Sequence, residues 1–108
     1  MELANYFKES SKLIEALAHD VRRDIVIELA KNYPNALRIC EIKTKKCITR
    51  PSLSHHFKVL VNAHVINYYH KGTKNFYYLS IDEASIDDCL NLLNRLKDFV
   101  GVKNDSSN

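Results

Sequence analysis

No apolar run in the chain approaches the roughly 18–20 residues that a membrane-spanning helix needs. The N-terminal stretch MELANYFKES contains two acids and lacks the basic n-region of a secretory signal. The three cysteines, Cys40, Cys47 and Cys89, form no paired disulfide framework, which is typical of a reducing compartment. We therefore expect a cytoplasmic protein without a membrane partner.

Glycine and proline are scarce, with two of each, so few positions interrupt the chain. Pro34 lies in a polar loop, and Pro51 fits the first turn of a helix, where its missing N–H is not needed. Gly72 stands between two aromatic runs, as a hairpin turn requires. Gly101 follows a long periodic segment, where a helix would end.

Hydrophobic periodicity predicts five helices and two strands. The helices are expected at 3–18, 21–31, 37–43, 50–63 and 83–100, and the strands at 65–70 and 75–80. Asp20 and Thr49 are placed to cap the second and fourth helices. This fold class, mainly α with a β-hairpin wing, is that of a winged helix-turn-helix. The 108 residues suffice for one such domain, expected over 1–101, with a disordered tail over 102–108.

Acidic residues are absent from Ile42 to Ile81. The same segment contains seven Lys or Arg and four of the five histidines, whereas all thirteen acids lie outside it. The net charge of only +3 conceals this asymmetry. A basic middle between acidic flanks is typical of a nucleic-acid-binding face, and a solvated charged surface is the alternative.

Rotation by about 100° per residue separates two faces of the helix expected at 50–63. Leu53, Phe57 and Leu60 form its buried stripe, and His56 lies on the edge of that stripe, where it would pack or hydrogen-bond within the protein. The opposite face is polar and cationic, which suits either solvent or a DNA groove, where Arg, Ser and His can bond base edges or phosphates. The expected DNA contacts here are Arg50, Ser52, Ser54, His55 and Lys58, with Lys45, Lys46 and Thr49 just before them.

The turn around Gly72 is also basic. Such a tip would contact the DNA backbone or minor groove and add salt-dependent affinity, unless it is a solvated turn. The expected contacts are His70, Lys71, Thr73 and Lys74. The neighbouring Tyr68, Tyr69, Tyr77 and Tyr78 are expected to pack in the core and across strands, and base stacking on single strands is the alternative.

Three stretches resemble the sequence signatures of the ArsR family (ArsR/SmtB type) of winged-helix repressors. IEALAHDVRRDIVIELA is similar to the second helix of that family, RPSLSHHFKVL to its recognition helix, and HKGTKNFYYLS to its wing. The resemblance covers about residues 13–79 and extends loosely to Phe99. It implies repression, relieved by an effector, through double-stranded DNA with an inverted repeat whose half-sites lie about one helical turn apart.

The resemblance also implies a homodimer in which the first and last helices form the interface. The apolar stripe of the last helix is wider than a small monomer needs, which agrees with this expectation. The expected interface residues are Leu3, Phe7, Ile14, Ile86, Leu90, Leu93, Leu96 and Val100.

The metal-sensing sites of the resembled family are incomplete in this sequence. A Cys-x-Cys pair of that family corresponds to Arg38 and Cys40 here, no cysteine precedes Cys40, and no histidine follows His70. We expect no metal ligand and no cofactor, and the effector is unknown. A thiol- or metal-responsive switch is an alternative, because two lysines precede Cys47 and would favour its thiolate.

His64 stands where the family often has a glycine with positive φ, a conformation that His tolerates better than most residues. An enzyme using His55 or His56 as a general base would lack an acid partner, because the nearest carboxylates in sequence are Glu41 and Asp82. We therefore expect a DNA-binding transcriptional regulator and no enzyme. A winged-helix protein-interaction module is the alternative.

Overall fold

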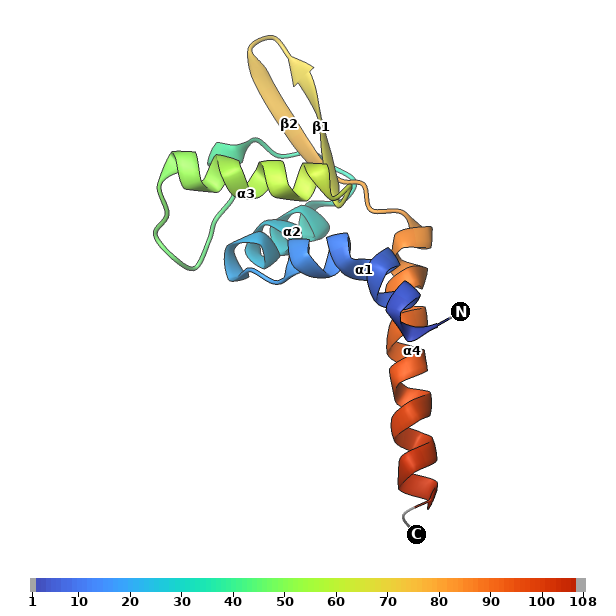
Figure 1. Cartoon of the computed structure of the whole chain (residues 1–108). Coiled ribbons are helices and arrows are strands. Elements are labelled where there is room, and N and C mark those ends of the chain that lie inside the picture. The colour runs from blue at the N-terminus through green and yellow to red at the C-terminus, as the bar shows by residue number, and fades with distance from the viewer. Residues whose placement is uncertain (1, 107–108) are drawn as a thin grey trace.

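The computed structural model describes residues 2–106, and its elements follow the order of a winged helix-turn-helix. The elements are α1 (Leu3–Leu17), α2 (Asp20–Asn32), the 3-10 turn η1 (Ile39–Glu41), α3 (Arg50–Asn62), β1 (Ile66–Lys71), β2 (Lys74–Leu79) and α4 (Glu83–Ser106). Figure 1 shows α3 and the hairpin on one side of α1 and α2, with α4 extending away from them. The predicted fold class is confirmed.

The helix expected at 37–43 is wrong, because only Ile39–Glu41 forms a single 3-10 turn. The cause is Leu37, which exchanges two backbone hydrogen bonds of 2.8 Å with Tyr77 of β2. Leu37 is thereby held extended against the wing, so no helix can begin at this residue. The described part of the chain has four α-helices rather than the five expected, and η1 takes the place of the third.

The starts of α2 and α3 depend on side-chain caps. Thr49 caps α3 as predicted, since its hydroxyl oxygen accepts the Ser52 amide hydrogen at 3.4 Å. The predicted cap of α2, Asp20, is wrong: α2 begins one residue earlier and His19 is its N-cap, with Nδ1 at 3.1 Å from the Val21 amide. The Asp20 carboxylate also accepts that amide, at 2.8 Å, so a second acceptor reinforces the same turn.

The hairpin has the register that its sequence requires. Ile66 pairs with Leu79 at the base and Lys71 with Lys74 at the tip, where Gly72 has a φ of 65°. The predicted glycine turn is therefore confirmed. His64, between α3 and β1, has a φ of 61°, which confirms the expectation of positive φ at this position.

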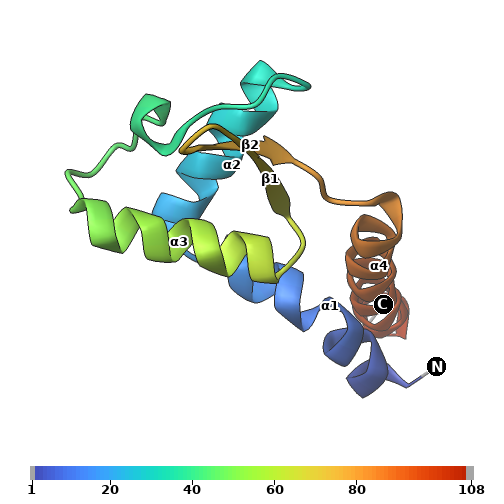
Figure 2. The same cartoon turned by 90° about the horizontal axis from the view of Figure 1, so that it is seen from above.

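The core lies between α2, α3 and the hairpin. Ile25 and Leu29 of α2 and Leu60 of α3 are completely buried, and burial of such a side chain stabilises the fold by about 1.5–3 kcal/mol. Phe57 of α3 meets Tyr77 of β2 edge-on, with ring centroids 4.6 Å apart. Because β1 packs on α3 and β2 on α2, the hairpin is anchored over both helices (Figure 2).

Helix α4 packs on α1 and gives the molecule an elongated shape of 61 × 27 × 22 Å. It continues through Gly101 to Ser106, so the predicted helix end at Val100 is wrong. The segment expected to be a disordered tail, 102–108, is thus helical as far as Ser106, and residues 107 and 108 lie outside the described residues. Across the described residues, no helix combines the length and apolar character needed to cross a membrane.

Candidate nucleic-acid interface

Helix α3 has the two faces that its sequence predicts. Phe57 and Leu60 are buried in the core, whereas His55 and Lys58 are exposed on the opposite face. The adjacent histidines are separated in the same way, because His56 is only 9% exposed. The predicted separation of their environments is confirmed.

The remaining predicted contacts of α3 lie at its start. Arg50 and Ser52 are exposed, and Ser54 is half-buried at the edge of the outward face. Thr49 is exposed but engaged, because its hydroxyl donates to the Ser52 hydroxyl oxygen at 3.0 Å while capping the helix. A ligand that bonds the Thr49 hydroxyl would therefore compete with the cap.

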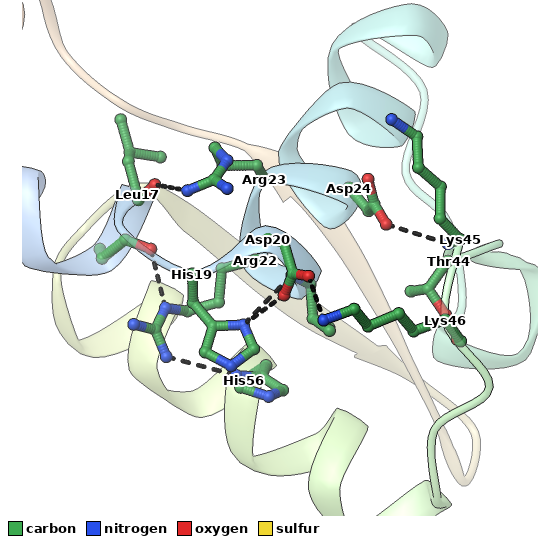
Figure 3. A network of polar contacts seen from close by, with 12 residues as sticks. Leu17, His19, Asp20, Arg22, Arg23, Asp24, Thr44, Lys45, Lys46 and His56 are labelled. Carbon is green, nitrogen blue, oxygen red and sulfur yellow. Dashed lines mark hydrogen bonds and ion pairs between the residues drawn. The ribbon is translucent and has the colours of Figure 1, made fainter.

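His56 connects α3 to the turn between α1 and α2. Its Nδ1 lies 3.3 Å from Nη1 of Arg22, and its ring lies 4.3 Å from that of His19 (Figure 3). Arg22 in turn donates from Nε to the Ala16 carbonyl at 2.8 Å and from Nη2 to the Glu15 carbonyl at 3.0 Å. One guanidinium thus joins the end of α1, the start of α2 and the middle of α3.

The charge state of His56 follows from these contacts. Burial lowers the pKa of His56, and the nearby His19, Arg22 and His55 lower it further, while Asp20 opposes them. An arginine can only donate, so Nδ1 of His56 accepts and the neutral ring carries its proton on Nε2. His56 therefore holds the orientation of α3 as a neutral acceptor, as the predicted internal role requires.

The connection before α3 is fastened to α2. Lys46 Nζ lies 2.7 Å from Asp20 Oδ2, and the Lys45 backbone amide donates to Asp24 Oδ2 at 3.0 Å (Figure 3). The Lys46 ammonium lowers the pKa of Asp20, and the Asp20 carboxylate raises the pKa of Lys46. Lys46 therefore differs from the other predicted contacts, because a carboxylate of the protein already offsets its charge.

The wing tip brings the second group of predicted contacts together. His70, Lys71, Thr73 and Lys74 are all exposed around Gly72. Thr73 and Lys74 also line a hollow with Arg50 at the start of α3, so the tip and the helix share one surface. Arg38 of the segment before η1 lines the same hollow. Sequence reasoning missed Arg38, because it lies outside the acid-free segment and three residues from Glu41.

The tyrosines of the wing pack across the strands, as predicted. Tyr77 is buried against Phe57, and Tyr69 stacks on Phe76 with ring centroids 5.4 Å apart and an interplanar angle of 13°. Tyr68 lies 5.4 Å from Tyr77. Tyr69 nevertheless remains 49% exposed, so its outer face is accessible.

Four of the five predicted dimer residues on α4 form one exposed stripe. At about 100° per residue, Ile86, Leu90, Leu93 and Val100 fall within an arc of about 80°. Leu93 is 59% exposed and Val100 58%, whereas Leu92, on another side of the helix, is 2% exposed. On α1, Phe7 and Ile14 are exposed as well, while Leu3 and Leu96 are half-buried.

The cysteines lie apart from any metal-ligand cluster. Cys40 and Cys47 are exposed, Cys89 is half-buried, and all three are free. Among the described residues, no three His, Cys, Asp or Glu side chains come together as a metal site would require.

Known transcriptional regulators are similar to this chain in sequence and in fold. No family model matches the sequence. An HTH-type transcriptional regulator, MJ1325 of Methanocaldococcus jannaschii, is 27% identical over 78 residues, which cover 72% of this chain and 85% of that protein. The crystal structure of the ArsR family transcriptional regulator RHA00566 superposes with a TM-score of 0.71 at 15% identity, over 87% of this chain and 92% of that one. The chain has the ArsR-type winged helix-turn-helix fold.

A second solved structure with the ArsR-type fold is that of a homodimer. The winged helix-turn-helix DNA-binding domain of Mb0332 from Mycobacterium bovis, a possible ArsR-family regulator, is homodimeric. It matches with a TM-score of 0.61 at 17% identity, over 89% of this chain and 86% of that one. At such identities the likeness establishes the ArsR-type fold of this chain.

Proposed function

We propose that the protein is a homodimeric transcriptional repressor that binds an inverted repeat in duplex DNA. The observation that carries this proposal is the surface shared by α3 and the wing tip, in which Arg50, Thr73 and Lys74 line one hollow within an acid-free segment. Such a surface presents cations and hydroxyls to a polyanion without a competing carboxylate of its own.

The two parts of this surface have different tasks. Helix α3 is about 20 Å long and fits the major groove, where Ser52, Ser54 and His55 reach base edges while Arg50, in the first turn, lies at the edge of the groove beside the wing. Lys58, His70, Lys71, Thr73 and Lys74 contact phosphates, which contributes affinity and little sequence information. Lys45 and Lys46 lie at the margin of the contact, because both are bound to carboxylates of α2. The backbone amide of Lys45 donates to Asp24, and the side chain of Lys46 pairs with Asp20.

A second copy of the chain covers the apolar stripes of α1 and α4. Apolar side chains such as Phe7, Leu90 and Leu93 would otherwise stay exposed to water on these helices. A two-fold axis relates the α1 and α4 helices of the two copies. It thereby presents the two copies of α3 to successive turns of DNA, which matches an inverted repeat. Bound in this way across a promoter, the dimer excludes polymerase.

Fluorescence anisotropy on duplex DNA from the region upstream of the gene tests this function. We expect binding tighter than micromolar in low salt and a steep decrease of affinity with salt, since several phosphates are contacted. Weak binding without salt dependence would instead favour the interaction module, for which the exposed face of Tyr69 offers an aromatic contact. A transcription assay with the bound promoter then separates repression from activation.

A further inference from the structure

A hollow of about 190 Å³ lies where three parts of the protein meet. Arg38 and Cys40 border it from the segment around η1, Arg50 from the first turn of α3, and Thr73 and Lys74 from the wing tip. The paired backbone of Leu37 and Tyr77 holds the first and last of these parts together. The backbone on two sides of the hollow is therefore held in place by the fold.

The charge around the hollow is uncompensated. None of Arg38, Arg50 and Lys74 has a carboxylate within 4.0 Å among the described residues. Lys46, by contrast, is paired with Asp20, and Lys31 lies 3.9 Å from Glu28. Among the described residues, three cations from separate elements thus line one space without a carboxylate paired to any of them.

Glu41 is the acid next to this space in the sequence, and its carboxylate is occupied. Its Oε1 accepts the backbone amide of Arg38 at 2.9 Å, so the carboxylate fixes the main chain of Arg38. This bond directs Glu41 to the backbone and leaves the Arg38 guanidinium available for another anion.

The donors suit a tetrahedral oxyanion. A guanidinium can form two parallel hydrogen bonds to phosphate, Lys74 adds a point charge, and the Thr73 hydroxyl can donate once more. The volume of about 190 Å³ compares with roughly 30 Å³ for one water, so a group of several atoms can enter.

We propose that this hollow binds a phosphate-type oxyanion through Arg38, Arg50 and Lys74. If the source is DNA, as the proposed function requires, the oxyanion is a backbone phosphate clamped between α3 and the wing. A free phosphate is the other source of the same chemistry. In either case Arg38 is a binding residue, and the wing and α3 act on one ligand together.

The first arm of the test uses inorganic phosphate. Amide shifts of ¹⁵N-labelled protein are followed as phosphate replaces chloride at constant ionic strength. We expect saturable shifts at Arg38, Thr73 and Lys74, and roughly tenfold weaker binding in Arg38→Gln. Lys12→Gln, which removes an exposed charge from α1, is the matched control and should bind as the wild type does.

The second arm uses duplex DNA and the same variants. Arg38→Gln should weaken binding roughly three- to tenfold and reduce the slope of log K against log salt by about 0.9, the effect of one lost phosphate contact. Arg38→Lys keeps the charge without the fork, so it should recover the salt slope more fully than the affinity. Thermal unfolding of each variant verifies that it is folded.

The outcomes separate the sources and the two proposals. Saturable phosphate binding with unchanged DNA affinity in Arg38→Gln supports the hollow and assigns it to a free oxyanion. Phosphate binding by a wild-type protein that binds no DNA also supports the hollow and defeats the proposed function. If Arg38→Gln matches Lys12→Gln in both arms, the hollow is not an oxyanion site.

Discussion

The surface of α3 and the wing differs from the surface of α1 and α4 in the kind of side chain that it exposes to water. On the outward face of α3 the exposed side chains include Arg50, Ser52, His55 and Lys58, whereas Phe57 and Leu60 are buried in the core. Along α4, by contrast, Leu90 and Leu93 are at least half exposed although the helix also has a buried side at Leu92. The first surface gains free energy from a polyanion and the second from another apolar surface, so one chain carries two unlike binding faces.

The largest expected effect is the loss of the apolar face. Leu93→Asp places a charge in the middle of the exposed stripe of α4, where a second copy would desolvate it. We expect a monomer, and about a hundredfold weaker binding to an inverted repeat because the two half-sites are no longer bound together. Sedimentation equilibrium measures the first effect and anisotropy the second.

Asn94→Asp is the matched control for this change. Asn94 is exposed beside Leu93, so the variant adds the same charge without removing an apolar side chain. It should stay dimeric. If Leu93→Asp is also dimeric at micromolar concentration, the exposed stripe is not the dimer interface. The stripe of α4 would then not be the apolar binding face that the comparison requires.

A smaller effect divides the cationic surface itself. His55→Ala should weaken binding to the operator about tenfold and leave binding to unrelated duplex nearly unchanged, because a base contact is lost. Lys71→Ala should weaken both DNAs equally and lower the salt slope by about one, because a phosphate contact is lost. Anisotropy titrations on both duplexes at several salt concentrations distinguish the two patterns. Equal losses on both duplexes for His55→Ala would show that α3 does not read bases through this side chain.

The sequence predicted the parts of this contrast that depend on periodicity. The rotation of α3 separated His55 from His56 correctly, because Leu53, Phe57 and Leu60 mark the buried stripe without any knowledge of the partner helices. Positive φ at His64 and the turn at Gly72 followed from the few residue types that tolerate these conformations.

Other features depend on contacts between distant residues and escaped prediction. The residues that follow Leu37 fit a helical pattern in the sequence, and only the pairing of Leu37 with Tyr77 makes it extended. The Lys46–Asp20 ion pair joins residues from different elements, so the acid-free segment overstated the free charge near α3. Arg38 was missed for the opposite reason, since its charge joins the cationic surface from outside that segment.

Acid should loosen the hold of α1 and α2 on α3. The pKa of His56 in the folded protein lies below its ordinary value near 6.5, which the unfolded chain retains. Below pH 6.5 the unfolded state therefore binds more protons, and stability rises with pH across this window. The stability from neutral His56 is complete above about pH 6.5 and is lost as the pH falls through the folded pKa.

Urea unfolding at a series of pH values from 7.5 to 5 measures this dependence. His56→Gln should be less stable at pH 7.5, where the acceptor for Arg22 and the packing on His19 are altered, and its stability should vary less with pH. His70→Gln is the control, because His70 is exposed at the wing tip and is not among the groups that lower the pKa of His56, so the pH profile of the wild type should stay intact. A wild-type profile that is flat over this range would contradict the lowered pKa of His56.

The smallest expected effect concerns the one predicted DNA contact that the protein already neutralises. Lys46→Gln should change the salt slope of DNA binding by less than Lys58→Gln does, because Asp20 lies 2.7 Å from Lys46 whereas Lys58 is exposed on the outward face of α3. Asp20→Asn should act in the opposite direction, since it releases the Lys46 charge and should raise DNA affinity about two- to threefold. Anisotropy with the double variant Asp20→Asn/Lys46→Gln tests the coupling: the gain should disappear. If the gain persists without Lys46, Asp20 repels DNA directly, and the cationic surface extends from α3 onto the start of α2.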